Sequence, residues 1–148
     1  MPEKQYPGRL QRLPGYDYSR RGAYFVTICT QHRGRWFGRV EQKAMILSAW
    51  GTVAAACWHS IPEHFAGVEL DAFVVMPDHV HGLLWLPGNG PVLSTIVGNY
   101  KAAVSRAIRR ADPSAPAVLW QRTFHDRIVR DERALTNIRR YIEENPRK

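Results

Sequence analysis

Two histidines one residue apart, His79 and His81, are the clearest candidates for metal ligands in this sequence. They begin the apolar run HVHGLLWL of residues 79–86, which is typical of a β-strand. Alternate residues of a strand point to the same face, about 7 Å apart along the chain at a rise of about 3.4 Å per residue. Two imidazoles on one face can converge on one ion, although such a pair can also be half-exposed sheet histidines beside a turn. A metal site would need a further ligand.

Two more polar side chains lie in the last segment with helical spacing, residues 131–144 and the residue that follows it. Tyr141 and Asn145 are four residues apart, which on a helix places them on one face, about 6 Å apart along the axis. A phenol and an amide oxygen could therefore face the same ion. Each also has a plainer explanation: Tyr141 could belong to the core, and Asn145 could simply end the helix before Pro146.

The elements that must position these side chains follow from hydrophobic periodicity. Strand patterns cover residues 23–30, 68–76, 79–86 and 124–129, and helical spacing covers residues 41–59, 94–110 and 131–144. The Pro77-Asp78 turn predicts an antiparallel hairpin, and Ser94 and Asp131 are the expected N-caps of the last two helices. The order β-α-β-β-α-β followed by a helix predicts an α+β fold: a ferredoxin/RRM-like antiparallel sheet with an added C-terminal helix.

The alternation along residues 79–86 also predicts the two faces of the sheet. Leu83 and Trp85 continue the histidine face, and Val80, Leu84 and Leu86 are expected to face the helices.

Length and composition favour one domain. The chain has 148 residues, of which 45% are hydrophobic and 23% charged, so it can bury one core. Residues 1–22, with several Pro and Gly, predict an irregular basic arm, and residues 23–148 a single domain. The tyrosines of the arm, interleaved with arginines, could stack on bases or pack on the domain.

Several protein classes are not expected. No apolar stretch is long enough to span a membrane, and no secretory signal is visible. Cys29 and Cys57 form neither a CxxC motif nor a zinc-site spacing, so reduced thiols and a cytoplasmic location are expected.

The charge is large and unevenly distributed. The formal net charge is +8; residues 1–40 hold 8 basic and 2 acidic residues, residues 41–100 hold 1 and 5, and residues 101–148 hold 12 and 6. Such an excess of positive charge favours an anionic partner, either nucleic acid or a membrane surface.

Five segments in order along the chain resemble the REP-associated tyrosine transposases, a branch of the single-tyrosine HUH transposases. They are PGYDYSRRGAYFVTICT, MPDHVHGLLWLP, YKAAVSRAI, WQRTFHDRIVRDE and RRYIEENP. The resemblance implies a bacterial, cytoplasmic enzyme that cleaves and rejoins single-stranded DNA at palindromic REP-like hairpins through a covalent 5′-phosphotyrosine intermediate. It implies that Tyr141 is the nucleophile and that His79, His81 and Asn145 bind Mg²⁺ or Mn²⁺. Residues 23–148 would then be the catalytic domain, and single-stranded or hairpin DNA, not a membrane, the partner.

Ten basic side chains are candidates for contacts with the DNA backbone. They are Arg20, Arg21, Arg33, Arg35, Lys101, Arg106, Arg109, Arg110, Arg139 and Arg140. The sequence leaves several alternatives open. The chain could be a non-catalytic single-stranded nucleic-acid-binding module on the same fold, and it could act as a monomer or a homodimer. The general base for the tyrosine is not evident, and His125 is only a weak candidate. Trp120 could be a core residue or a stacking platform.

Overall fold

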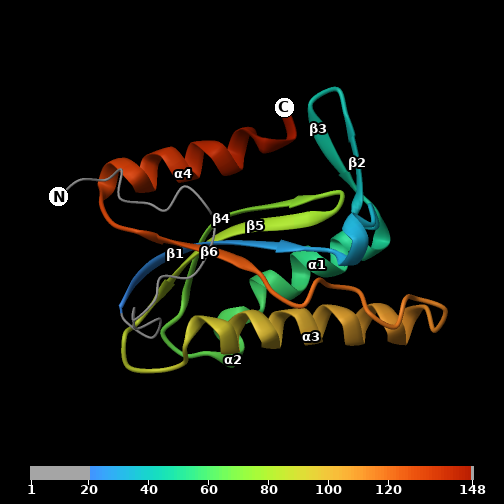
Figure 1. The fold of residues 1–148 in the computed structure, drawn as a ribbon, viewed down its shortest axis with the longest axis horizontal. Coiled ribbons are helices and arrows are strands. Elements are labelled where there is room, and N and C mark those ends of the chain that lie inside the picture. The colour runs from blue at the N-terminus through green and yellow to red at the C-terminus, as the bar shows by residue number, and fades with distance from the viewer. Residues whose placement is uncertain (1–20, 148) are drawn as a thin grey trace.

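The computed structural model describes residues 21–147. The elements in chain order are β1 (Gly22–Cys29), η2 (Gln31–Arg33), β2 (Gly38–Glu41), β3 (Ala44–Leu47), α1 (Ala49–His59), α2 (Ile61–His64), β4 (Glu69–Met76), β5 (His79–Leu86), α3 (Leu93–Ala111), β6 (His125–Val129), α4 (Glu132–Glu144) and η3 (Asn145–Arg147). β4, β5, β1 and β6 form, in that order, one antiparallel four-stranded sheet. The helices α1, α2 and α3 lie on one side of this sheet and α4 lies on the other (Figure 1). This arrangement confirms the predicted α+β fold with an added C-terminal helix.

The strand register divides the sheet into the two predicted faces. Thr27 of β1 is opposite His81 of β5, and Phe25 of β1 is opposite Leu83 of β5 and Arg127 of β6. These residues share the face toward α4, where Leu83 joins a small hydrophobic cluster with residues of that helix. The opposite face of β5 was predicted to meet the helices. Its residues Val80, Leu84 and Leu86 belong to the main core. The side chains of β5 that could do chemistry therefore lie under α4.

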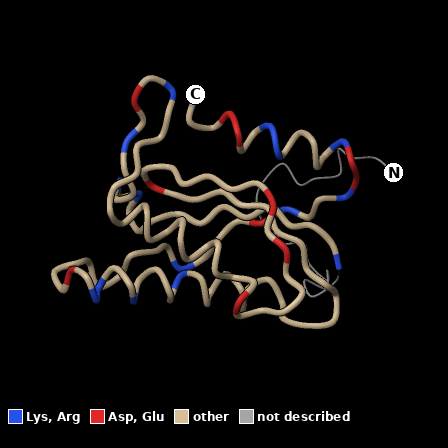
Figure 2. The backbone as a smooth tube through the Cα atoms, turned by 180° about the vertical axis from the view of Figure 1, so that it is seen from behind, with Lys and Arg blue, Asp and Glu red and all other residues tan. Residues whose placement is uncertain are grey.

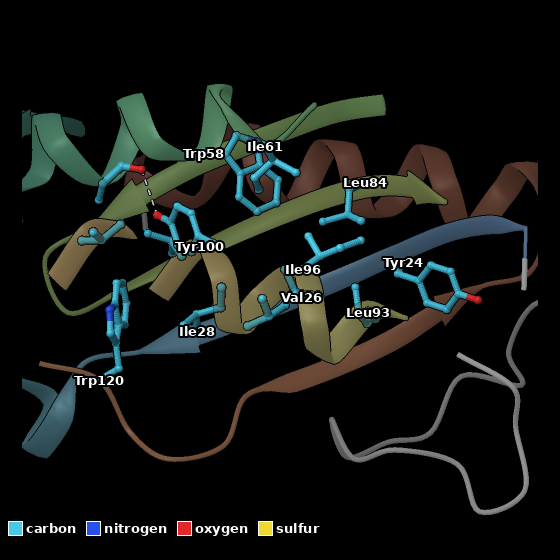
Figure 3. Close-up of a cluster of buried hydrophobic side chains, with 14 of the residues drawn as sticks. Tyr24, Val26, Ile28, Trp58, Ile61, Leu84, Leu93, Ile96, Tyr100 and Trp120 are labelled. Carbon is cyan, nitrogen blue, oxygen red and sulfur yellow. Dashed lines mark hydrogen bonds between the residues drawn. The ribbon is translucent and has the colours of Figure 1, made fainter. Parts of the chain in front are cut away.

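The main core fills the space between the sheet and the pair α1 and α3 (Figure 3). Trp58 is 1% exposed, and its ring lies so close to Gly82 that a Cβ atom there would be 2.2 Å from it. Only glycine at this strand position allows that approach. The buried Tyr100 hydroxyl donates a 2.9 Å hydrogen bond to the carbonyl of Ala54, which ties α3 to α1. Trp120 also belongs to this core, and its Nε1–H donates to the Lys101 carbonyl.

The predicted helix over residues 41–59 is wrong in its first part. Residues 44–47 form β3, which pairs with β2 in a hairpin that projects from the domain (Figure 1). Gln42 and Lys43 adopt φ angles of 51° and 65°, the left-handed geometry that a two-residue hairpin turn requires. The helix starts only at Ala49, because the Ser48 side chain accepts a hydrogen bond from Gly51 N–H and caps it.

The two other predicted caps had opposite outcomes. Asp131 caps α4 as predicted, with its Oδ1 accepting a 2.9 Å hydrogen bond from Ala134 N–H. Ser94 does not cap α3, since that helix begins one residue earlier and has Val92 at the N-cap position without a side-chain hydrogen bond. Within residues 21–147, no helix is long and apolar enough to cross a membrane.

Candidate active site

The two histidines of β5 converge as their spacing predicts. The ring centroids of His79 and His81 are 4.6 Å apart, with an angle of 73° between the planes. His79 Nδ1–H donates to Asp78 Oδ1 at 2.7 Å, and His81 Nδ1 lies 2.9 Å from Thr27 Oγ1. With the hydrogen of each ring on Nδ1, both Nε2 atoms keep a lone pair. Polar partners behind the second nitrogen are the usual arrangement of metal-binding histidines.

The surroundings of His81 favour the neutral form of its imidazole. His81 is 5% exposed, and this burial, with the charges of His79 and Arg33 in the same direction, lowers its pKa to about 3. The imidazole of His81 is therefore neutral near pH 7. Partial burial opposes ionisation of Asp78, but hydrogen bonds from His79 and Arg33 outweigh it and lower the pKa of this carboxyl. The ionised carboxylate fixes the tautomer of His79.

Backbone contacts hold Asp78 in place behind the histidines. The N–H and the hydroxyl of Thr30, which is fully buried at the end of β1, both donate to the Asp78 carbonyl at 3.0 Å. Arg33 Nε–H donates to Asp78 Oδ2 at 3.1 Å. The segment after β1 thus fixes the turn between β4 and β5.

Tyr141 lies on α4 directly beside this pair. Its ring centroid is 5.3 Å from that of His81 and 6.1 Å from that of Phe25, and the side chain is 41% exposed. The alternative that Tyr141 is a core residue is therefore wrong. Tyr141 presents its ring to the histidine face and part of its surface to solvent.

Asn145 follows one turn later and is 9% exposed. Asn145 is the C-cap of α4, with φ −56° and ψ −46°, and its N–H donates to the Ile142 carbonyl before the chain continues into η3, as expected for a residue that ends the helix. Among the described residues, no group of three His, Cys, Asp or Glu side chains could hold a metal ion. A metal bound by His79 and His81 therefore needs an amide such as that of Asn145, or solvent and substrate oxygens, to complete its ligands.

An ion pair that the sequence did not predict ties α4 to the sheet. Arg139 donates from Nε to Asp71 Oδ1 at 2.9 Å and from a terminal nitrogen to Oδ2 at 2.6 Å, and Trp85 Nε1–H donates to the same carboxylate at 3.0 Å. These hydrogen bonds, that from Arg139 first, lower the pKa of Asp71 to about 2. Asp71 lies where the β4–β5 register shifts, between Leu70 and Phe73, and such a bulge can turn a side chain to a new direction.

The predicted DNA-contacting residues lie in different places. Arg33, Arg139 and the exposed Arg140 lie on elements of the candidate site, although Arg33 and Arg139 are engaged with Asp78 and Asp71. The residues on α3, across the sheet from Tyr141, are Lys101, Arg106, Arg109 and Arg110. Arg21 and Arg35 are exposed outside α3 and α4, and Arg20 lies outside the described residues.

Two of the α3 residues hold the chain itself. Lys101 Nζ donates to the carbonyl of Gln121 at 2.7 Å, and Arg109 donates to the carbonyl of Ala117 at 2.7 Å. These hydrogen bonds hold the segment between α3 and β6 against α3. Sequence spacing alone could not distinguish this structural role from a contact with DNA. The four-residue spacing of Tyr141 and Asn145 did predict that they share a face of the last helix. Thr27, Asp71 and Asp78 had no signal beyond being polar residues at a strand or turn.

A cavity of about 290 Å³ opens next to Tyr141, between α4 and the sheet. The residues that line it are Phe25, His81, Arg127, Asn137, Ile138 and Tyr141.

Known proteins resemble the chain over most of its length. The family described as "Transposase IS200 like" matches residues 23–145. An uncharacterized protein of Haemophilus influenzae is 33% identical over 159 residues, covering 93% of this chain and 87% of the relative. A second protein of that organism, provisionally named a REP-associated tyrosine transposase, is 26% identical and covers 88% of this chain and 73% of its own length.

Two solved structures share the fold. A REP-associated tyrosine transposase bound to a REP hairpin superimposes with a TM-score of 0.70 at 18% identity, over 92% of this chain and 73% of that one. A provisionally named transposase from Deinococcus radiodurans superimposes with a TM-score of 0.59 at 25% identity, over 90% of this chain and 95% of that one. The chain belongs to the IS200-like transposase family.

Proposed function

We propose that this transposase cleaves and rejoins single-stranded DNA at REP-like hairpins, with Tyr141 as the nucleophile. The observation that carries the proposal is the contact between an exposed tyrosine ring and the buried, neutral His81, 5.3 Å apart and within one chain. The family and the hairpin-bound structure of a protein with the same fold support DNA hairpins as the substrate class.

The reaction exchanges one phosphodiester for another. The Tyr141 oxygen attacks the phosphorus, its proton leaves to a base, the P–O bond to the 3′-oxygen breaks, and the leaving 3′-oxygen takes up a proton from solvent. The products are a strand that ends in a 3′-hydroxyl and a strand whose 5′-phosphate is esterified to Tyr141. In the reverse sense, a 3′-hydroxyl attacks the phosphotyrosine and releases the phenol. Because the bond energy is conserved in the ester, no ATP is needed.

The residues present fit a divalent cation. The two Nε2 atoms of His79 and His81 are on one face, and the amide of Asn145 is one helical turn from Tyr141 on α4 and η3. When bound, Mg²⁺ or Mn²⁺ would polarise the scissile phosphate and offset the charge that develops on it. Imidazole ligands favour Mn²⁺ over Mg²⁺, which prefers oxygen.

The chain's own residues set the geometry of attack. Thr27 and Asp78 orient the two imidazoles, and the pair of Asp71 with Arg139 fixes the helix that carries the nucleophile. Arg140, exposed next to Tyr141, supplies positive charge for the DNA backbone.

The direct test is a search for the covalent product. The protein is incubated with end-labelled hairpin oligonucleotides, drawn from palindromic repeats of the genome that encodes it, with Mn²⁺, and the mixture is resolved by denaturing electrophoresis. A labelled species that migrates with the protein is expected for the natural chain and not for Tyr141→Phe. The variant should still shift the same hairpin in a native gel. A chain that binds hairpins and forms no adduct on any of them would instead be a non-catalytic binding module.

A further inference from the structure

We propose that the cavity beside Tyr141 binds one unpaired purine base of the nucleotide next to the scissile phosphate. This inference rests on the proposed function, because it names a subsite for the same DNA strand. The cavity would determine where along the single strand the enzyme cuts.

The position of the cavity makes it part of the reaction site. Tyr141 and His81 themselves line it, together with Phe25, whose ring stacks on His81 at 5.3 Å and meets Tyr141 edge-on at 6.1 Å. A group held in this space is in contact with the attacking side chain. For a nucleic acid, that group must be the phosphate that reacts or a base adjacent to it.

The size of the cavity fits one base. Its volume of about 290 Å³ is at the lower end of the range of ligand pockets, roughly 300–1,000 Å³. It is bounded by α4 on one side and by β1, β5 and β6 on the other. A single flat ring system can enter this gap, whereas a base pair in a duplex cannot. The base must therefore be unpaired, as are those of the single strand that flanks a hairpin.

The lining favours a base over a phosphate. Phe25 and Ile138, which line the cavity and belong to one packed hydrophobic cluster, form an apolar base to it, with 4% and 7% exposure. An apolar slot gives a base a surface to pack on and gives a phosphate nothing to replace its hydration. Two polar side chains, Asn137 and Arg127, complete the lining and can reach the edge of a ring.

These two polar groups favour a purine. On the Hoogsteen edge, an arginine can donate two hydrogen bonds to O6 and N7 of guanine and an asparagine can pair with N6 and N7 of adenine, and pyrimidines lack this N7 acceptor, although their Watson–Crick edge is open to single hydrogen bonds. Asn137 precedes Tyr141 by four residues on α4, so both lie on one face of that helix. Arg127 lies across the strand pair from Phe25. The base would thus be held between the helix and the sheet, one turn from the nucleophile.

The DNA side of the test needs no protein variant. In a hairpin that the natural chain cleaves, each unpaired nucleotide within three positions of the cut is replaced in turn by the other bases and by an abasic residue. We expect one position at which replacing the purine by a pyrimidine or an abasic residue lowers the rate of adduct formation by about 5- to 150-fold, the discrimination of a bidentate base contact. Equal rates for all bases and for the abasic residue at every position would contradict the proposal.

Protein variants test whether the cavity binds the base at that position. Asn137→Ala should abolish the difference between the purine and the abasic residue at the sensitive position and leave the other positions unchanged, and Arg127→Ala should do the same if its guanidinium reads the base. Thr136→Ala, an exposed neighbour on α4 that does not line the cavity, is the matched control and should retain the natural preference. A sensitive position whose preference survives in both Asn137→Ala and Arg127→Ala would place the base elsewhere.

The experiments distinguish an error in the proposed function from an error in the proposed base-binding cavity. If no hairpin forms a Tyr141-dependent adduct, the proposed function is wrong. If adducts form but Asn137→Ala and Arg127→Ala slow all oligonucleotides equally, abasic ones included, the function stands and the base-binding cavity is wrong.

Discussion

At the scale of single residues, the properties of the site depend on the atoms behind the two histidines. His81 is buried against Thr27, and His79 is oriented by Asp78, which Arg33 and Thr30 hold in turn. The same burial that lowers the pKa of His81 to about 3 makes the charged form of the ring costly. The ring of His81 is thus neutral near pH 7, the form in which an imidazole can bind the proposed cation.

The carboxylate of Asp78 provides a prediction at this scale. Asp78→Asn removes the anion that accepts from His79 Nδ1, so the tautomer and orientation of that ring are less strongly fixed. The Mn²⁺ concentration needed for half-maximal adduct formation should rise about 10- to 100-fold, as found for partners behind metal ligands. Asp112→Asn, a change in the segment that follows α3, is the matched control. An unchanged Mn²⁺ dependence in Asp78→Asn would show that the carboxylate does not support a metal ligand.

At the scale of elements, the position of α4 relative to the sheet decides whether Tyr141 can reach the substrate. The hydrophobic stripe of α4 packs on the histidine face through Leu135, Ile138 and Ile142, but apolar contacts alone leave the helix able to slide. The bidentate pair of Arg139 with Asp71 adds a directional contact. Arg139 is therefore a positioning residue for the helix.

The acid sensitivity of this anchor can be measured. The pKa of Asp71 is lowered to about 2, so its contribution to stability is complete above about pH 4 and is lost as the pH falls toward 2. Denaturant unfolding at pH 6 should show Asp71→Asn to be less stable than the natural chain by about 1 kcal/mol, since the pair is partly exposed.

The comparison between the two chains isolates Asp71 from other acid-sensitive groups. The difference in the free energy of unfolding should shrink between pH 4 and pH 2. A difference that stays constant over this range would mean that ionisation of Asp71 does not stabilise α4. At pH 7, Asp71→Asn should also form adduct more slowly while binding hairpin DNA as well as the natural chain.

Most of the elements of the fold could be predicted from the sequence. Period-two and helical spacing predicted the four strands of the sheet, α3 and α4, because each of these buries one continuous apolar face. Residues 44–47 were misassigned, since Met45 and Leu47 fit the spacing of the following helix as well as a strand. The left-handed turn at Gln42 and Lys43 contains no glycine or asparagine, the residues from which such a turn is usually predicted.

The candidate site was predictable in part for the same reason. Side chains at regular spacings, such as His79 with His81 and Tyr141 with Asn145, could be placed on common faces before the structure was known. The partners Thr27 and Asp71 come from distant strands, and the bulge that turns Asp71 toward α4 depends on three-dimensional packing. Spacing in one dimension carries no information about such contacts.

At the scale of the whole molecule, the sheet separates the side of the main core from the side of the candidate site. The main core fills the side of α1 and α3, and the side of α4 carries the histidines, Tyr141 and the adjacent cavity. Basic residues lie on both sides and on the β2–β3 hairpin (Figure 2). Those on α3 are on the far side from Tyr141, and Lys101 and Arg109 are bound to the chain's own carbonyls. A single strand of DNA that reaches Tyr141 would therefore meet Arg140 and, in the adjacent cavity, Arg127.

The contact between Tyr141 and His81 of one chain predicts that the enzyme acts in cis. Tyr141 lies against His81 of the same chain, and Asp71 fixes that arrangement. A mixture of Tyr141→Phe and His81→Ala should therefore form no more adduct than the two variants do separately. Recovery of activity in the mixture, with a dimer seen by light scattering, would show that α4 completes the site of a partner.

The central claim is that Tyr141 becomes covalently bonded to DNA, and peptide mapping of the adduct tests it most directly. Trypsin cuts after Arg140 and Arg147, so residues 141–147, YIEENPR, form one peptide with a single tyrosine. After nuclease digestion of the adduct, mass spectrometry should find a nucleotide phosphate on this peptide. The other tyrosines, which should be unmodified, are Tyr6, Tyr16, Tyr18, Tyr24 and Tyr100. A nucleotide on any of these, with peptide 141–147 unmodified, would contradict the account.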